Sequence, residues 1–407
     1  MTACWRVQWF ALCLMATACS QGVAMKDGGK AKGKILTVDS GDVGYHVTME
    51  LDLEDRAHMV YYDKKNQSLK FVSQSSAGFA ISVVDDACER CLYATLKMDG
   101  DNEPHLAYYS DSTQTLTYAY RQQGRWKKEP IEWGKGTGMG ARLLFDSDQL
   151  LHALYYSGDG YLKHAWRVRR SPEEMERLRR EALEKARRLD KKAKRKSSTG
   201  SAGASTPQLA EPAEGFWGSE RVDKANGSEK VQISFVRQPS GRLATSYLHW
   251  SGLSSELRIA MQAEDGSWST EVAAFEDNPG KSSALFFTPG GEPHVVFREA
   301  RKDRLAMAET SIEGWKAEPL VPDAYNMSID VDASLNLLVA YEKLSGRDPR
   351  KGHLCMAWRR DGSWFRYEVD TARGSGSYLS AGLTNSGTPV IAYFEETNKS
   401  LKLFVGE

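Results

Sequence analysis

A short phrase repeats along this chain: a small or proline residue, a histidine, two apolar residues and an aromatic pair. The clearest copies are Ala57–Tyr62, Pro104–Tyr109 and Leu151–Tyr156, whose histidines lie 47 positions apart, and weaker copies begin at Pro293 and Pro389. A period of this length, filled with short strand-like runs, is typical of β-propellers and solenoids, in which each repeat is one structural unit stacked on its neighbours. The repeat therefore predicts an array of such units.

Each copy of the phrase lies inside a longer unit. After the aromatic pair comes a strand with a leucine and an alanine, such as Leu116–Ala119, and then an aromatic residue, such as Trp126. The unit closes with an apolar and an acidic residue, as in Ile131–Glu132, and a further strand precedes the next phrase. Glycine, asparagine, aspartate and proline separate these runs, as is typical of turns between strands. The pattern predicts four short strands per unit.

The two ends of the chain indicate that the array closes into a ring. The seventh unit starts near Ser377 and ends with Leu401–Val405, so its fourth strand is missing. The segment Ile35–Asp39 carries the Val-Asp ending of a fourth strand and leads directly into the first unit. Ring closure leaves only short, protected sheet edges. We therefore predict an all-β fold, a seven-bladed β-propeller over residues 34–407, closed by an N-terminal strand.

Residues 1–19 are typical of an export signal. The apolar run 7–18 is too short to span a bilayer, and Ala-Thr-Ala stands directly before Cys19. Small residues before a cysteine resemble the bacterial lipobox, and the resemblance implies that Cys19 is lipidated and becomes the mature N-terminus. Ser20 resembles an outer-membrane sorting signal, which implies a lipoprotein facing the periplasm or the cell surface. The triplet also suits ordinary signal peptidase, so a secreted soluble protein is the alternative, and residues 20–33 are predicted to be a flexible tether.

Cysteine usage fits an oxidising compartment. The chain has six cysteines, of which Cys88 and Cys91 lie in the loop between the first two units. No βαβ pattern surrounds them, so a local disulfide is predicted in preference to a redox centre. No second cysteine pair stands at the spacing of a zinc site, so no metal is expected. Cys355 alternates with apolar neighbours and is expected to be a small buried residue.

The third unit carries a long insertion, residues 168–214. Ser171–Glu174 has the pattern of a helix start, with serine as N-cap, proline in the first turn and glutamate three residues after the serine. A thin apolar seam predicts a charged, coiled-coil-like helix, followed by a basic run and a Ser/Gly/Ala-rich return. Residues 167–196 contain fourteen basic and six acidic side chains. Two interpretations stay open: a solvated helix without a partner, or a docking arm for an acidic partner or an anionic surface.

The repeated histidines have a structural interpretation. His58, His105, His152 and His294 hold the same place in their own units, so a ring keeps them apart instead of gathering them around one metal or substrate. We expect each to make a hydrogen bond to a neighbouring turn or blade. No Gly-x-Ser-x-Gly, His-Glu-x-x-His or phosphate-binding loop is present. No catalytic residue, cofactor or metal is therefore predicted.

Two turns, Glu264–Trp268 and Arg360–Trp364, resemble a shortened form of the Asp-box of the sialidase-like propellers. The whole repeat also resembles the Pro-His-x-x-Tyr-Tyr propeller units of bacterial secreted proteins and lipoproteins. The resemblance implies the propeller fold over nearly the whole mature chain. Sialidase activity would imply an arginine triad, an acid/base carboxylate and a tyrosine nucleophile at the channel. The Phe-Arg-Ile-Pro start of that family is absent, however, and Phe297–Glu299 is a poor match.

A non-catalytic exported propeller that binds a protein or another cell-envelope ligand is the function that these patterns favour. Loops after the second and fourth strands share one face of such a ring, and their acidic and aromatic residues are the candidate ligand contacts: Asp63, Asp111, Asp159, Trp133 and Trp250. These residues also fit the alternative, a carbohydrate-binding, lectin-like propeller, with a degenerate glycosidase third. The formal net charge of zero indicates no general attraction to nucleic acid. We expect a monomer whose partner is an envelope protein or glycan and whose membrane contact is the N-terminal lipid.

Overall fold

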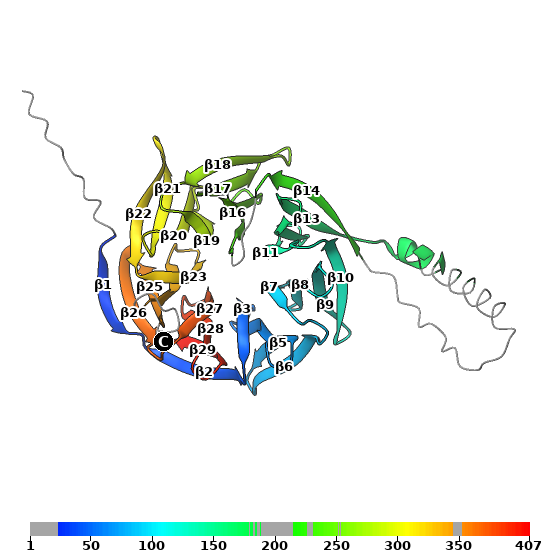
Figure 1. The fold of residues 1–407 in the computed structure, drawn as a ribbon, viewed down its shortest axis with the longest axis horizontal. Coiled ribbons are helices and arrows are strands. Elements are labelled where there is room, and N and C mark those ends of the chain that lie inside the picture. The colour runs from blue at the N-terminus through cyan, green and yellow to red at the C-terminus, as the bar shows by residue number, and fades with distance from the viewer. Residues whose placement is uncertain are drawn as a thin grey trace, which may run out of the picture.

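Seven sheets form a ring around a central channel (Figure 1). The computed structural model describes residues 23–178, 180–181, 184, 188, 215–225, 231–250, 252, 254–344 and 352–407. The expected signal segment with Cys19, and most of the expected insertion, lie outside these residues. The architecture confirms the prediction of an all-β, seven-bladed propeller.

The first strand of each blade lies nearest the channel, and the last lies at the rim. Blade one contains β3 (Val43–Leu51), β4 (Ala57–Asp63), β5 (Ser68–Ser75) and β6 (Gly78–Asp85). Blade two contains β7 (Cys91–Met98), β8 (Pro104–Ser110), β9 (Thr115–Gln122) and β10 (Arg125–Trp133). Blade three contains β11 (Met139–Phe145), β12 (Leu151–Ser157), β13 (Tyr161–Arg169) and β14 (Gly215–Asp223).

The remaining blades repeat this order. Blade four contains β15 (Ser234–Arg237), β16 (Leu243–Trp250), β17 (Ser255–Gln262) and β18 (Trp268–Ala274). Blade five contains β19 (Pro279–Phe287), β20 (Pro293–Glu299), β21 (Arg304–Ser311) and β22 (Gly314–Pro322). Blade six contains β23 (Ala324–Val331), β24 (Leu337–Lys343), β25 (His353–Arg360) and β26 (Ser363–Asp370), and β1 (Met25–Lys30) pairs with its outer edge. Blade seven contains β27 (Ser375–Leu383), β28 (Pro389–Glu395), β29 (Ser400–Gly406) and β2 (Gly33–Ser40).

The repeated phrase forms the second strand of a blade. Every residue of β4, β8, β12 and β28 is buried. A middle strand of a propeller blade packs against the neighbouring blade on each face, so apolar residues are needed at both odd and even positions. Outer strands such as β10 consist mostly of exposed and partly buried residues because one face meets solvent. This difference explains why the phrase is the most conspicuous part of each repeat.

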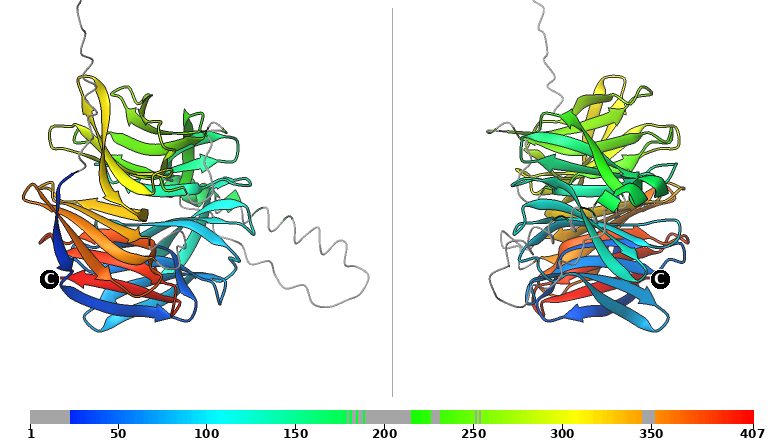
Figure 2. Two further views of the ribbon diagram at one scale, coloured as in Figure 1. Left: turned by 60° about the vertical axis from the view of Figure 1, so that its left-hand side comes forward. Right: turned by 90° about the vertical axis from the view of Figure 1, so that its right-hand side faces the viewer.

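The long connection in blade three leaves the ring at its rim. Helical residues 172–178 follow β13 and project outward in Figures 1 and 2. β13 continues to Arg169 and pairs with β14 from Gly215, so residues 168 and 169, expected within the insertion, belong to a strand. Within the described residues, no helix is long and apolar enough to span a membrane.

The N-terminal segment follows the rim of three blades. The amide of Val23 donates to the carbonyl of Pro319 in blade five at 3.1 Å. β1 then pairs in parallel with β26 of blade six, and β2 pairs antiparallel with β29 of blade seven, with Ile35 opposite Phe404. The path is visible as the blue segment along the outside of Figure 1.

β1 corrects the expectation of a flexible tether over residues 20–33. Five of the six β1 residues are exposed, so the strand is held mainly by its backbone and carries no apolar alternation from which it could be predicted. Gly28 permits the close approach: a Cβ atom at this position would lie 2.2 Å from the ring of Tyr367 on β26. From the sequence alone, the glycines of this segment favour a flexible tether. In the structure, glycine instead lets the backbone lie directly against a tyrosine ring.

Adjacent blades are joined by a repeated hydrogen bond between a tyrosine and an acid. The first tyrosine of the phrase donates to the acidic residue that ends the previous blade, at 2.5–2.7 Å. A lysine or arginine also pairs with each of these acids. The five pairs are Tyr61–Asp39, Tyr108–Asp85, Tyr155–Glu132, Tyr247–Asp223 and Tyr393–Asp370.

Two junctions use an apolar version of this contact. Ala274 and Val321 occupy the position of the acid, opposite the third-strand leucine. In the blades that follow, Phe297 packs with Ala306, and Tyr341 packs in one cluster with Val321 and Cys355. Cys355 is a buried free thiol, as expected. The acid and the basic residue are thus absent together, which avoids a buried unpaired charge.

The repeated histidines bind turns inside their own blades. His58, His105 and His152 each place Nε2 within 2.8–3.2 Å of an aspartate six residues earlier, in the turn between the first and second strands. In blade one, burial acts to raise the pKa of Asp52, but hydrogen bonds from His58 and Arg56 outweigh it and lower the pKa to about 2. The structural interpretation of these three histidines is confirmed.

Candidate functional site

The ligand-face residues named from the sequence lie on one face of the ring but do not line its channel. Asp63 is fully buried; it pairs with Lys70 at 2.7 Å and accepts from the side chain of Asn66 at 2.7 Å. Asp63 is therefore wrong as a ligand contact, because its carboxylate organises the turn that follows β4. Asp111 pairs with Arg90 at 3.3 Å. Asp159 pairs with two basic residues at the rim, Lys163 and Arg221.

The two predicted tryptophans differ in exposure. Trp133 is 69% exposed at the end of β10. Trp250 is half-buried at the end of β16. Neither lines the channel. Trp133 consequently offers an exposed aromatic surface away from the channel, and this makes it a useful control position.

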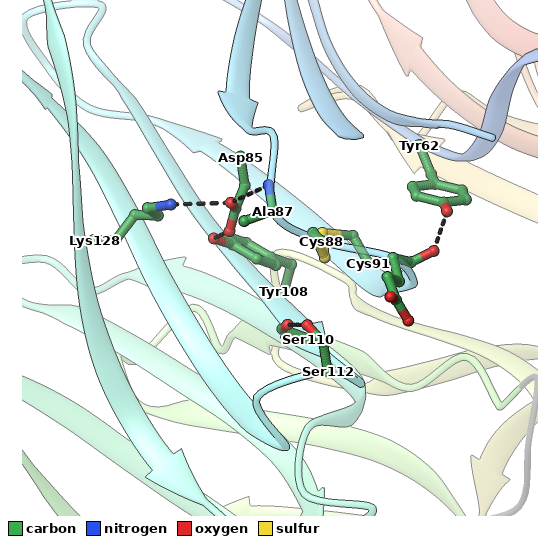
Figure 3. Close-up of a disulfide and its surroundings, with 10 residues drawn as sticks. Tyr62, Asp85, Ala87, Cys88, Cys91, Tyr108, Ser110, Ser112 and Lys128 are labelled. Carbon is green, nitrogen blue, oxygen red and sulfur yellow. Dashed lines mark hydrogen bonds and ion pairs between the residues drawn. A yellow bond between two sulfur atoms is a disulfide. The ribbon is translucent and has the colours of Figure 1, made fainter. Parts of the chain in front are cut away.

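Cys88, in the loop between β6 and β7, forms a disulfide with Cys91, the first residue of β7 (Figure 3). Both cysteines are buried, and the hydroxyl of Tyr62 donates to the carbonyl of Glu89 inside the same loop. Asp85, just before the loop, accepts hydrogen bonds from Tyr108 and Lys128 and from the amide of Ala87. This loop leads into the inner strand β7, so its fixed shape positions the start of that strand. The described residues contain no cluster of three potential metal ligands.

The seven inner strands enclose a channel with a volume of about 1620 Å³. Each inner strand begins on the face that carries the loops after the second and fourth strands, because every blade runs outward from its inner strand. The first residues of the inner strands therefore meet at one mouth of the channel. Five of these residues, which we call the aromatic mouth, line the channel there: Tyr45, His46, Tyr93, Tyr325 and Tyr378.

Three residues of the aromatic mouth have left-handed backbones. His46, Tyr93 and Tyr378 have φ values of 55°, 55° and 48°, and each lies where the inner strand shifts register against its neighbour. Gly140 occupies the equivalent position in blade three, with φ of 65°. Positive φ is uncommon for bulky side chains, and such backbone strain gathers at functional sites. Strain repeated at bulky residues of one channel mouth makes this end of the channel the candidate site.

The rings of the aromatic mouth lie close together. The centroid of the His46 ring is 4.5 Å from that of Tyr378, and the Tyr45 ring is 5.8 Å from the same tyrosine. The hydroxyl of Tyr45 donates to Asp42 at 2.8 Å, and the Lys64 ammonium lies 5.3 Å from the Tyr45 ring. These contacts hold three of the five rings, those of Tyr45, His46 and Tyr378, in one group.

Two carboxylates line the same mouth, Glu342 and Glu396. Glu342 takes the place of the second aromatic residue of the phrase, opposite the third-strand leucine, and is fully buried. Asn326 donates to it at 2.6 Å and Ser377 at 3.4 Å, yet burial raises the pKa of Glu342 to about 7. Burial, together with the charges of Glu396 and Glu342, raises the pKa of the Tyr378 hydroxyl.

No protein-family model matches the chain, and a search of curated proteins finds no match. Three solved structures illustrate its likeness to known folds. A polysaccharide lyase, an ulvan lyase bound to a GlcA–Rha3S saccharide, has a TM-score of 0.53 and 10% identity over 93% of this chain and 95% of its own. A puromycin hydrolase has a TM-score of 0.51 and 13% identity over 93% of this chain and 56% of its own. A protein of unknown function from Dyadobacter fermentans DSM 18053 has a TM-score of 0.46 and 10% identity over 92% of this chain and 98% of its own.

The likeness shows the fold alone. At these identities, the solved structures support a seven-bladed β-propeller and carry no residue-level assignment to this chain. The Asp-box-like segments lie where the sequence places them, between β17 and β18 and between β25 and β26. In the first of these turns, Asp265 accepts from the amide and the hydroxyl of Ser267. The turn is thus held by its own aspartate and lies on the face opposite the aromatic mouth.

The aromatic mouth could not be identified from the repeat. Its members lie at the variable starts of the first strands, and the backbone shifts that turn them into the channel have no sequence signature. The one available signal was Glu342, where an acid replaces an aromatic residue in an otherwise apolar phrase. Such a substitution in a buried strand indicates either a structural ion pair or a functional carboxyl group.

Proposed function

We propose that this protein is a non-catalytic binding propeller whose ligand is a saccharide of the cell envelope, held at the aromatic mouth. One observation carries the proposal: aromatic rings and carboxylates converge at one end of a channel of about 1620 Å³. Aromatic rings offer flat apolar faces to the C–H surfaces of sugars, and carboxylate, amide and hydroxyl groups bind sugar hydroxyls. Concave sites with a few convergent polar groups are the usual form of small-molecule sites.

The similar polysaccharide lyase supports the choice of ligand class, because that structure contains a saccharide bound to a ring of this fold. A protein partner would instead require a broad apolar surface, and the exposed apolar residues are distributed around the rim strands.

Glycine substitution at the strained positions tests the proposal without loss of the fold. Tyr93→Gly and Tyr378→Gly remove a ring where φ is positive, and glycine accepts that backbone. We expect a saccharide identified on a glycan array to bind each variant about tenfold more weakly. Both variants should stay folded, with a lower melting temperature for Tyr378→Gly because its ring packs on His46 and Tyr45. Trp133→Ala is the matched control, since it removes an exposed ring that lies on the same face but away from the channel. Full affinity of both glycine variants, or a loss confined to Trp133→Ala, would place the ligand elsewhere.

A second candidate, cleavage of the bound saccharide, is favoured by Glu342. A buried carboxyl group with a pKa of about 7 can exchange protons near neutral pH, as a general acid or base must. The same array ligand should therefore be incubated with the protein and assayed for new chain ends. If no new chain ends form, the result supports the binding role. Turnover by the wild type that disappears in Glu342→Gln would establish an enzyme.

We also propose that the protein is exported and anchored as a monomer through a lipid on Cys19, with the ligand in the outer membrane or at the cell surface. The secreted soluble form is the alternative. Radiolabelled palmitate should enter the wild-type protein and not Cys19→Ala, which should become soluble. An unlabelled wild-type protein would remove the anchor from the proposal.

The finer features of the ring belong to the same proposal. Pairing of β2 with β29 supports closure by an N-terminal strand, and pairing of β13 with β14 supports a charged insertion between them. The hairpin position of the two Asp-box-like turns supports a place among the sialidase-like propellers.

A further inference from the structure

One position of the channel wall breaks the sevenfold pattern. Two residues after His46, Tyr93 and Tyr378, and at the positions that strand pairing aligns with these, the inner strands present small side chains to the channel: Thr48, Thr95, Ser234, Ala284, Ser328 and Ser380. In blade three, the equivalent residue, opposite Leu154, is Arg142. A single guanidinium therefore stands in a ring that is otherwise made of small residues.

The small residues have a structural role that arginine does not share. Thr48 donates to the carbonyl of Ala94 at 2.8 Å, Thr95 accepts from the amide of Leu143 at 3.4 Å, and Ser380 accepts from the amide of Met49 at 3.0 Å. These hydrogen bonds join neighbouring inner strands. Arg142 instead donates to the carbonyl of Ala141, beside it in the chain, at 2.9 Å. The rest of the guanidinium is available to the channel.

The charge of Arg142 is not balanced by a neighbouring acid. No described carboxylate lies within ion-pair distance of Arg142. Two residues further along the inner strands, the carboxylate of Glu50 already pairs with Lys97. Asp330 at that level accepts from the amides of Val331 and Leu383. Depth inside the ring lowers the pKa of Arg142 to about 10, which leaves it charged at neutral pH. Arg142 is partly buried and lines the channel, so its unpaired charge is available to an anion that enters there.

We infer that Arg142 is the anchor for an acidic group of the bound saccharide, a carboxylate or a sulfate, inserted past the aromatic mouth. The inference rests on the proposed function and narrows its ligand to acidic saccharides. Gly140 lies between Arg142 and the mouth on the same strand, where blades one, two and seven have an aromatic residue. Gly140 packs against Val231 and Ile233, just before blade four: a Cβ atom at Gly140 would lie 3.4–3.7 Å from their atoms, so blade three contributes no ring to the aromatic mouth. The Arg142 guanidinium lines the channel and can bind planar oxyanions through two parallel hydrogen bonds.

The test uses the chain from residue 20 onward and ligands that differ only in charge. Calorimetry would compare an oligogalacturonate tetramer with its methyl ester, and a sulfated galactose tetramer with its desulfated form. We expect the wild type to prefer an acidic member by about tenfold or more, with the preferred pair showing which oxyanion fits. Arg142→Thr, which restores the common ring residue, should abolish the preference, and Arg142→Lys should retain part of it. Arg237→Gln, a channel cation at the opposite mouth, is the matched control and should retain it.

Equal binding of charged and neutral members by the wild type, or an unchanged preference in Arg142→Thr, would overturn the inference. A protein that binds none of the four saccharides would refute the proposed function, and inorganic sulfate then becomes the probe. Sulfate binding that disappears in Arg142→Thr would sustain the anion anchor without a saccharide ligand. Absence of sulfate binding would overturn the anchor as well.

Discussion

Removal of residues 20–40 is expected to cost more than about 4 kcal/mol of the free energy of unfolding, well above a typical single substitution. β2 is the fourth strand of blade seven, and its loss exposes the edge of β29. The deletion also removes Asp39, which accepts from Tyr61 of blade one at 2.5 Å and pairs with Lys70 at 3.3 Å. One short segment therefore connects the last blade to the first.

A shorter deletion, of residues 20–31, is the matched control. It removes β1, whose residues are mostly exposed, but leaves β2 and Asp39 in place. We expect its melting temperature to stay close to that of the full chain and well above that of the longer deletion, as measured by circular dichroism and urea denaturation. Equal stability of the two deletions would show that β2 does not hold the ring together.

Substitution of the tyrosine that joins blades one and two is expected to have the second largest effect. Tyr108 is fully buried and donates to Asp85 at 2.6 Å (Figure 3). Tyr108→Ala leaves a large cavity between two blades and should cost about 3–5 kcal/mol. Tyr108→Phe removes only the hydroxyl and should cost about 1–2 kcal/mol, because Lys128 and the amide of Ala87 continue to bind Asp85. Denaturant titration of both variants gives these differences.

Blade five offers the reciprocal experiment. Phe297 holds the position of Tyr108, but Ala274 stands where the acid would be. Phe297→Tyr should destabilise the protein by about 1–3 kcal/mol, since it buries a hydroxyl without an acceptor. The same chemical group would thus stabilise one junction and destabilise another. A neutral Phe297→Tyr together with a neutral Tyr108→Phe would mean that packing alone holds the blades together.

The sequence predicts the blades well because their middle strands are buried on both faces. Apolar phrases such as Pro104–Tyr109 repeat at nearly fixed spacing, and the histidine and tyrosine within them bind acids at fixed distances along the chain. β1 was missed because a strand held by backbone hydrogen bonds needs no side-chain pattern. Asp63 was misplaced because a turn aspartate and a ligand-binding aspartate look alike in a loop.

The channel residues were the hardest to predict. His46, Tyr93 and Tyr378 share a strained backbone, but no residue type marks such a backbone when the side chain is not glycine. Arg142 becomes unusual only after the seven inner strands have been aligned by their hydrogen bonds. Sequence periodicity describes what the blades have in common, whereas a binding site depends on where one blade differs from the rest.

From the pairing of β2 with β29 we expect blade seven to be completed last during folding. Ile35 emerges among the first residues of the fold, and its partner Phe404 among the last, so this contact has nearly the greatest sequence separation that the chain allows. Local hairpins such as β8–β9 can form while synthesis continues, but blade seven has to wait for the C-terminus. Until then β2 is a strand without a partner. The charged side chains of Lys34 and Asp39 protect it from pairing with another chain. Synthesis of β29, rather than of any earlier blade, is thus the step that we expect to limit how soon the ring resists proteolysis.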